Sequence, residues 1–153
     1  MEWKLEHRED GATWIGLSGE ITENSDFAPI LGKISNLAVF DLSDVNRINS
    51  CGVREWIHFV TSIGQAGKRL VLERCSVPFV HQLNMITNFA GQAEIHSIFA
   101  PYFCPACGSE AARVVDLRTD APVNLGDAPA CEKCGTAMEF DDMPESYLTF
   151  RKT

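Results

Sequence analysis

The sequence lacks the two features that would place it in a membrane or direct it to secretion. Its 153 residues contain no run of about 18 uncharged apolar residues, the length a membrane-spanning helix needs. The first ten residues, MEWKLEHRED, are charged and lack the apolar segment of a signal peptide. We therefore expect a cytoplasmic protein with no membrane insertion.

The chain also lacks an excess of basic residues. Its formal net charge is −8 at pH 7, and the excess of acid is shared: residues 1–100 carry 8 basic and 12 acidic side chains, residues 101–153 carry 5 and 9. Contacts to phosphates supply much of the affinity for nucleic acids, and an acidic domain without a basic stripe repels that backbone. We expect no nucleic-acid partner.

Residues 1–100 alternate strand-like and helix-like patterns, which predicts an α/β domain. The helix over 52–64 is the clearest, because its apolar residues recur every three or four positions. Shorter helices are expected to begin near Ser25 and near Ser76, where a serine can cap the first turn. Apolar runs predict strands, and an edge strand is expected within the first ten residues; the runs are 12–19, 37–43, 70–75 and 93–99.

Pro101 marks a change in composition. Residues 101–153 are richer in turn-forming residues and have only scattered apolar side chains. A segment of about 50 residues with so little core usually needs a cross-link or a metal to fold. We therefore divide the chain into a domain over 1–100 and a small domain over 101–153.

Four of the six cysteines occur as two Cys-x-x-Cys-Gly motifs, CPACG and CEKCG, with 23 residues between Cys107 and Cys131. Each motif is typical of a zinc knuckle, and two knuckles joined by a hairpin give a zinc ribbon with tetrahedral sulfur ligands at about 2.3 Å from the metal. The sequence predicts one structural Zn²⁺ because sulfur would fill every position. The predicted ligands are Cys104, Cys107, Cys131 and Cys134.

Other interpretations of the cysteines remain open. Iron of the rubredoxin type uses similar knuckles, although ligand chemistry favours zinc. Disulfides are disfavoured in a reducing compartment, and a redox dithiol needs only one motif. Cys51 and Cys75 are expected to be small buried or half-buried thiols, and a nucleophilic Cys51 is the less favoured alternative.

The segment DLSDVNRINSCGVREW, residues 41–56, leads into the main helix. We expect the preceding strand to end here in a polar loop, with Ser50 at or near the N-cap. Unpaired amides and the positive end of the helix dipole lie at such a position, so a phosphate on this hydroxyl would be well received. A serine that only caps the helix, worth about 1 kcal/mol, is the alternative.

Three motifs resemble the STAS domain, the family named for sulfate transporters and anti-sigma factor antagonists. They are LSGEIT (17–22), DLSDVNRINSCG (41–52) and SVPFVHQLNM (76–85), and the resemblance covers residues 1 to about 99. It implies a mixed β-sheet with helices mainly on one face. It also implies a domain that binds partners rather than catalysing a reaction, so we expect no enzyme.

In the antagonist branch of this family, an anti-sigma kinase phosphorylates a serine in an Asp-Ser-Ser/Thr-Gly motif and the complex dissociates. Ser50 falls on that serine and Gly52 on the glycine. Asn49 stands where the family often has aspartate, Cys51 replaces a hydroxyl residue, and Thr22 ends a turn that usually carries an acid. These departures alter kinase recognition, so the phosphorylation switch is altered or absent.

The sequence therefore predicts a bacterial, non-catalytic interaction module that resembles an anti-sigma factor antagonist. Its partner is expected to be a regulatory protein such as an anti-sigma factor or a serine kinase, and a homodimer is possible. The alternatives are a scaffold subunit of a larger signalling or transport assembly without phosphorylation, and an iron- or thiol-dependent redox protein. With Ser50 as the phosphorylation candidate, the predicted partner-binding residues are Thr22, Ser25, Asn49, Cys51, Gly52 and Arg54.

Overall fold

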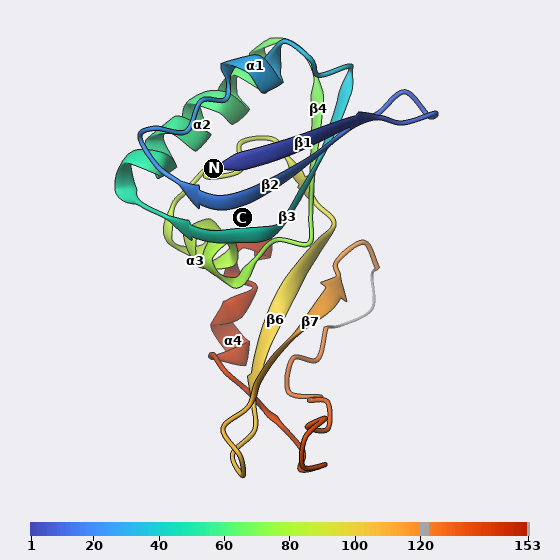
Figure 1. Ribbon diagram of the computed structural model, residues 1–153, viewed down its shortest axis with the longest axis vertical. Coiled ribbons are helices and arrows are strands. Elements are labelled where there is room, and N and C mark those ends of the chain that lie inside the picture. The colour runs from blue at the N-terminus through green and yellow to red at the C-terminus, as the bar shows by residue number, and fades with distance from the viewer. Residues whose placement is uncertain (120–122, 153) are drawn as a thin grey trace.

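A computed structural model describes residues 1–119 and 123–152, and it contains two β-sheets (Figure 1). The first sheet has five strands in the order β1-β2-β3-β4-β5, and the second has three in the order β7-β6-β8. The strands are β1 (Glu2–His7), β2 (Thr13–Ile21), β3 (Leu37–Ile48), β4 (Arg69–Glu73), β5 (Glu94–Ile95), β6 (Ser97–Phe103), β7 (Glu110–Asp116) and β8 (Glu139–Phe140).

The five-stranded sheet is mixed, which confirms the predicted α/β class. β1 is an edge strand antiparallel to β2, whereas the pairs β2–β3, β3–β4 and β4–β5 are parallel. The strands predicted over 12–19, 37–43 and 70–75 are all present. Parallel neighbours require crossover connections, and helices supply them here.

Three helices cover one face of this sheet: α1 (Ala28–Leu31), α2 (Ser50–Gln65) and α3 (Val77–Met85). Trp56 of α2 is fully buried and lies in edge or tilted contact with five other aromatic rings. These rings belong to Phe27, Phe40, Phe59, Phe79 and Phe89. In the described part of the chain, no helix is both long enough and apolar enough to span a bilayer.

β3 is longer than predicted. We expected a polar loop after residue 43, but the strand continues to Ile48 and pairs with β2 as far as the Ile21–Ile48 pair. Leu42, Val45 and Ile48 are buried in the core. Their spacing of three breaks the alternation of a regular strand, because the β2–β3 register shifts between Gly16 and Glu20. The irregular ladder hid the strand from the sequence pattern.

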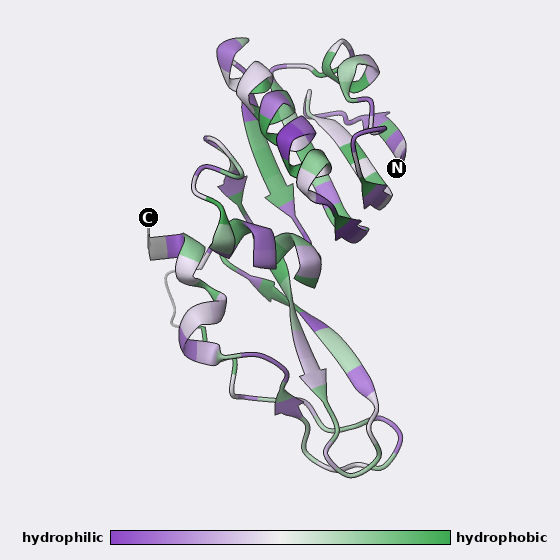
Figure 2. Ribbon diagram, turned by 90° about the vertical axis from the view of Figure 1, so that its left-hand side faces the viewer, coloured by the Kyte–Doolittle hydropathy of each residue, from purple (hydrophilic) through white to green (hydrophobic). Residues whose placement is uncertain are grey.

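The strand predicted over 93–99 is wrong in its bounds, because β5 ends at Ile95 in the first sheet and β6 begins at Ser97 in the second. Figure 2 shows the second sheet extending below the first. The His96 amide donates to the Leu72 carbonyl of β4, while its carbonyl accepts from the Leu117 amide beyond β7. Pro101, which we expected to mark a break, lies inside β6. It opposes Ala112 in the ladder, and its carbonyl accepts from the Asp141 amide.

The end of the chain folds back onto α3. Helix α4 (Pro144–Tyr147) and the 3₁₀ helix η1 (Thr149–Lys152) lie beside it. The Asn84 amide group donates to the Tyr147 carbonyl at 2.8 Å and accepts from the Phe150 amide at 3.0 Å. Tyr147 is buried, and its hydroxyl donates to the Phe99 carbonyl at 2.6 Å. The C-terminal segment is thus bonded to both α3 and β6.

Candidate metal centre and the start of helix α2

The first Cys-x-x-Cys motif forms a tight turn between β6 and β7. The Cys104 amide donates to the Ser109 carbonyl at 2.8 Å, which closes the hairpin, and the Gly108 amide donates to the Cys104 carbonyl at 2.9 Å. Gly108 has φ +76°, a conformation that glycine adopts without strain. This turn directs the two cysteine side chains to the same side.

The second motif repeats the same local geometry. The Cys131 amide donates to the Thr136 carbonyl at 2.8 Å, and the Gly135 amide donates to the Cys131 carbonyl at 2.8 Å. Gly135 has φ +77°. The two motifs are therefore equivalent turns, which the shared Cys-x-x-Cys-Gly pattern predicted.

The structure brings the four sulfurs of the two turns together. Cys104 Sγ lies 3.4 Å from Cys134 Sγ, and Cys107 Sγ lies 3.6 Å from Cys131 Sγ. All four ligand atoms lie within 4.8 Å of one another, so the quartet could hold a metal ion. Cys104 and Cys131 are buried, whereas Cys107 and Cys134 are exposed.

Two hydroxyl groups lie beside the exposed sulfurs. Ser109 Oγ is 3.1 Å from Cys107 Sγ, and Thr136 Oγ1 is 3.3 Å from Cys134 Sγ. The Ser109 hydroxyl, followed by its amide, lowers the pKa of Cys107 to about 6. The Thr136 hydroxyl and amide likewise lower the pKa of Cys134. Each turn thus favours the thiolate of its second cysteine, the form that binds metal. At Cys104 the Cys107 amide lowers the pKa, but burial and the Cys134 thiol raise it, to about 11.

We did not single out these hydroxyls from the sequence, although a signal was present. Ser109 and Thr136 both stand two residues after the second cysteine of their motif, so the pattern is Cys-x-x-Cys-Gly-Ser/Thr in each turn.

The segment between the two turns lies against the face of the second sheet. Tyr102 is buried, and its hydroxyl donates to the Leu125 carbonyl at 3.0 Å. The Arg113 guanidinium donates to the Asp127 carbonyl at 2.9 Å. Leu125 and Met138 are buried in the same continuous core as the helices of the first sheet. These contacts fix the second turn relative to the first.

At the start of α2, the residue that caps the helix is Asn49 and not Ser50. The Asn49 side-chain oxygen accepts from the Gly52 amide at 2.7 Å, and Ser50 is the first residue of the helix. The alternative that Ser50 serves as the cap is therefore wrong. Ser50 is exposed. Its modification stays a prediction.

Among the residues predicted to bind a partner, exposure differs. Cys51 and Arg54 are exposed, and Thr22 and Asn49 are partly buried. Ser25 is 7% exposed, and its hydroxyl accepts from the Thr22 amide at 2.9 Å. Gly52 is buried against the end of β2, where a methyl group would overlap the Ile21 carbonyl. Ser25 and Gly52 thus lie below the surface, where they support the exposed residues.

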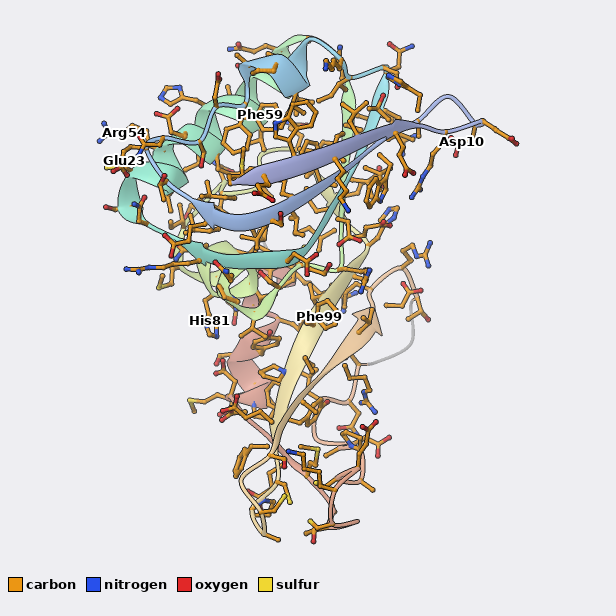
Figure 3. The ribbon with its side chains drawn as sticks, viewed as in Figure 1. Asp10, Glu23, Arg54, Phe59, His81 and Phe99 are labelled. Atoms are coloured by element: carbon orange, nitrogen blue, oxygen red, sulfur yellow. The ribbon has the colours of Figure 1, made fainter. Side chains whose placement is uncertain are left out.

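An acid and a base flank the start of α2. Glu23 accepts from the Asn49 side chain at 3.0 Å, and its backbone and Asn49 lower the pKa of its carboxyl. Arg54 lies one helical turn after Ser50. Figure 3 shows both side chains projecting from the same end of the molecule, where β2 and β3 finish. Charge of both signs is therefore available at this surface.

The two remaining cysteines differ from each other. Cys51 is exposed, contrary to the expectation of a buried or half-buried thiol, whereas Cys75 is fully buried. Burial, and then the nearby Asp41 carboxylate, raise the pKa of Cys75 far above that of an ordinary thiol. Cys75 is consequently an inert core residue.

Comparison with known proteins adds no relative to this picture. A scan against models of protein families found no match, and searches of curated proteins and of solved structures found none. What the two sites can do therefore follows from their own geometry.

Proposed function

We propose that this chain is a non-catalytic interaction module that docks onto a regulatory protein through the start of α2 and holds one structural zinc ion. The observation that carries the proposal is the position of Ser50. Its exposed side chain stands at the first residue of a 16-residue helix. A protein partner such as an anti-sigma factor or a serine kinase can reach it there.

The first turn of α2 is suited to a phosphorylated serine. The amides of a first helical turn have no partner within the helix, and the helix dipole is positive at this end. Asn49 occupies the Gly52 amide and leaves the Ser50 side chain free of the capping role. Arg54, four residues on, lies on the same side of the helix and can pair with a phosphate.

The arrangement of the sheet supports the resemblance to the STAS family. The family implies a mixed sheet with helices mainly on one face, and the first sheet with α1, α2 and α3 has that arrangement. In that family the corresponding surface binds regulatory proteins, and phosphorylation of the serine releases them.

A docking module without phosphorylation is the second candidate, and Glu23 favours it. Its carboxylate is bonded to Asn49, the residue just before Ser50, and would repel a phosphate. In this form the chain would be a constitutive subunit of a larger signalling or transport assembly.

Affinity purification with wild-type and Ser50→Asp chains tests the proposal. We expect the acidic substitution to weaken or redirect partner binding. Thr61→Asp is the matched control, because Thr61 is an exposed residue later in α2, and it should leave binding unchanged. If all three chains recover the same partners at the same strength, the proposal that charge at Ser50 regulates partner binding is wrong. Phosphopeptide mapping of the native protein then separates the two candidates.

The metal proposal rests on the sulfur geometry. A tetrahedral zinc ion with bonds of about 2.3 Å places its sulfurs about 3.8 Å apart. Two of the six sulfur pairs, at 3.4 and 3.6 Å, are close to that edge length, and all four sulfurs lie within 4.8 Å of one another. With four sulfur ligands no position remains for water, so zinc here would stabilise the fold and would not catalyse a reaction. Iron, the alternative, would make the protein coloured.

A further inference from the structure

β7 is an edge strand of the second sheet. It pairs with β6 on one side, and the strand order β7-β6-β8 places it at the margin of the described residues. In Figure 1 it lies beside β6, on the side away from α4. An edge strand presents unpaired amides and carbonyls that can bond to another strand.

The hydrogen bonds beyond the two ends of the β6–β7 ladder show which backbone groups point outward. The Cys104 amide bonds to Ser109, and the Leu117 amide bonds to His96. Hydrogen-bonded pairs alternate with non-bonded pairs in an antiparallel ladder, so the odd-numbered residues of β7 face β6. Pro101, which has no amide hydrogen, opposes Ala112 at a non-bonded position, as this pattern requires. The outward groups belong to Glu110, Ala112, Val114 and Asp116.

The side chains of β7 offer little protection against pairing. Six of its seven residues are exposed, and Val115 is the exception. Val114 is 45% exposed, one of three large apolar side chains so exposed in the described chain. The strand contains neither proline nor lysine, which commonly block edges, and its charged residues Glu110, Arg113 and Asp116 leave Ala111, Ala112 and Val114 uncharged between them.

A second copy of β7 can pair antiparallel with the first only if residues with outward backbone groups oppose each other. The twofold axis of such a dimer then passes through one residue of β7, which lies opposite its own copy. An axis at Arg113 is unfavourable, because it sets Arg113 against its own copy and Glu110 against Asp116. An axis at Ala112 sets the Glu110 carboxylate against Val114.

An axis at Val114 sets no like charges directly opposite each other. Val114 then meets its own copy and Ala112 meets Asp116, while Glu110 meets Arg118, which lies just beyond β7 and whose guanidinium is bonded to Asp116. Three pairs within the two strands would each exchange two backbone hydrogen bonds. We propose that the chain forms a homodimer by antiparallel pairing of β7 with β7 about Val114, which joins two three-stranded sheets into one of six strands. This contact is independent of Ser50.

Sedimentation velocity on the full, metal-loaded chain tests the dimer. Wild type should sediment as a dimer that dissociates on dilution. Val114→Lys places two like charges across the axis and should weaken dimerisation by about tenfold or more. Ala112→Pro, which removes an outward amide without touching the β6 ladder, should have the same effect.

Met85→Lys is the matched control, because Met85 is 70% exposed and lies on α3, away from β7. It should dimerise like wild type. Metal content and circular dichroism show whether each variant is folded. If Val114→Lys does not fold, Ala112→Pro provides the test. A wild type that stays monomeric up to about 1 mM would overturn the proposal. A dimer unchanged by both β7 substitutions, or weakened equally by Met85→Lys, would overturn it as well.

Discussion

At the scale of single residues, the two hydroxyls beside the sulfurs tune the metal-free site. With its pKa lowered to about 6, the Cys107 thiol is largely a thiolate at neutral pH and becomes protonated as the pH falls through that value. This thiolate is ready for metal, since binding otherwise has to displace a proton. The Ser109 hydroxyl is the largest cause of the lowered pKa.

Replacing Ser109 by alanine should therefore raise the pKa of Cys107 toward that of an ordinary thiol, about 8.5. Competition of the metal-loaded chain with a chelator across pH 5 to 9 reports this pKa, because metal must displace the proton of a protonated thiol. The metal affinity of Ser109→Ala should begin to fall at a higher pH than that of wild type. Ser109→Thr keeps the hydroxyl and should titrate like wild type. Equal titration of wild type and Ser109→Ala would show that the hydroxyl has no such role.

Gly52 and Gly64 both lie in α2 but differ in their surroundings. A methyl group on Gly52 would overlap the Ile21 carbonyl, whereas a methyl group on Gly64 would lie in open space. We expect Gly52→Ala to lower the free energy of unfolding by about 1–3 kcal/mol through overpacking. Gly64→Ala should raise it by about 0.5–1 kcal/mol, because alanine favours the helix. Urea denaturation of both variants measures the difference, and equal values would contradict the close approach of α2 to β2.

At the scale of elements, Asn84 connects α3 with the C-terminal segment through two hydrogen bonds, to Tyr147 and Phe150. Asn84→Ala leaves both backbone groups without that partner and should cost about 1–3 kcal/mol of stability. Met85→Ala, at the exposed neighbouring position, should change stability by less than about 0.5 kcal/mol. Thermal unfolding of the two variants provides the comparison. Equal changes in stability for the two variants would mean that Asn84 does not hold the C-terminal segment against α3.

The elements that the sequence predicted well have a regular period. The apolar face of α2 repeats at helical spacing, and Trp56, Val60 and Ile63 are buried as that pattern requires. The error over 93–99 arises where the chain leaves the first sheet and enters the second. His96 bonds to β4 with its amide and to Leu117 with its carbonyl, and no local pattern encodes such a division.

The candidate sites could be predicted to different extents. Cysteine spacing is local, so it identified the quartet that the structure brings together. The capping role of Asn49 and its bond to Glu23 depend on how the end of β2 approaches α2. That approach is a tertiary contact, and it could not be read from residues 41–56 alone.

At the scale of the whole molecule, the two sheets differ in how they are stabilised. The first sheet buries the aromatic cluster around Trp56 beneath its helices. The second sheet joins the edge of this core through β6, but its β7 is exposed and its β8 has only two residues. Structural zinc in small domains contributes apparent binding energies of about 10–16 kcal/mol, which is enough to hold such a module.

Chelation of the metal should therefore unfold the second sheet first. Hydrogen exchange measured by mass spectrometry should show faster exchange over residues 97–119 and 123–140 after chelation. Exchange in β2 and β3 should change little, because neither strand supplies a cysteine of the quartet or pairs with β6, β7 or β8. A uniform loss of protection would mean that the sheets unfold as one unit, and an unchanged pattern would mean that the metal does not stabilise the module.

The most direct measurement is the metal content and visible spectrum of the chain purified without added metal. A structural tetrathiolate of zinc predicts one zinc ion per chain in a colourless protein, and loss of that ion on Cys104→Ser or Cys131→Ser substitution. A protein without bound metal, or a coloured protein with one iron per chain, would contradict it.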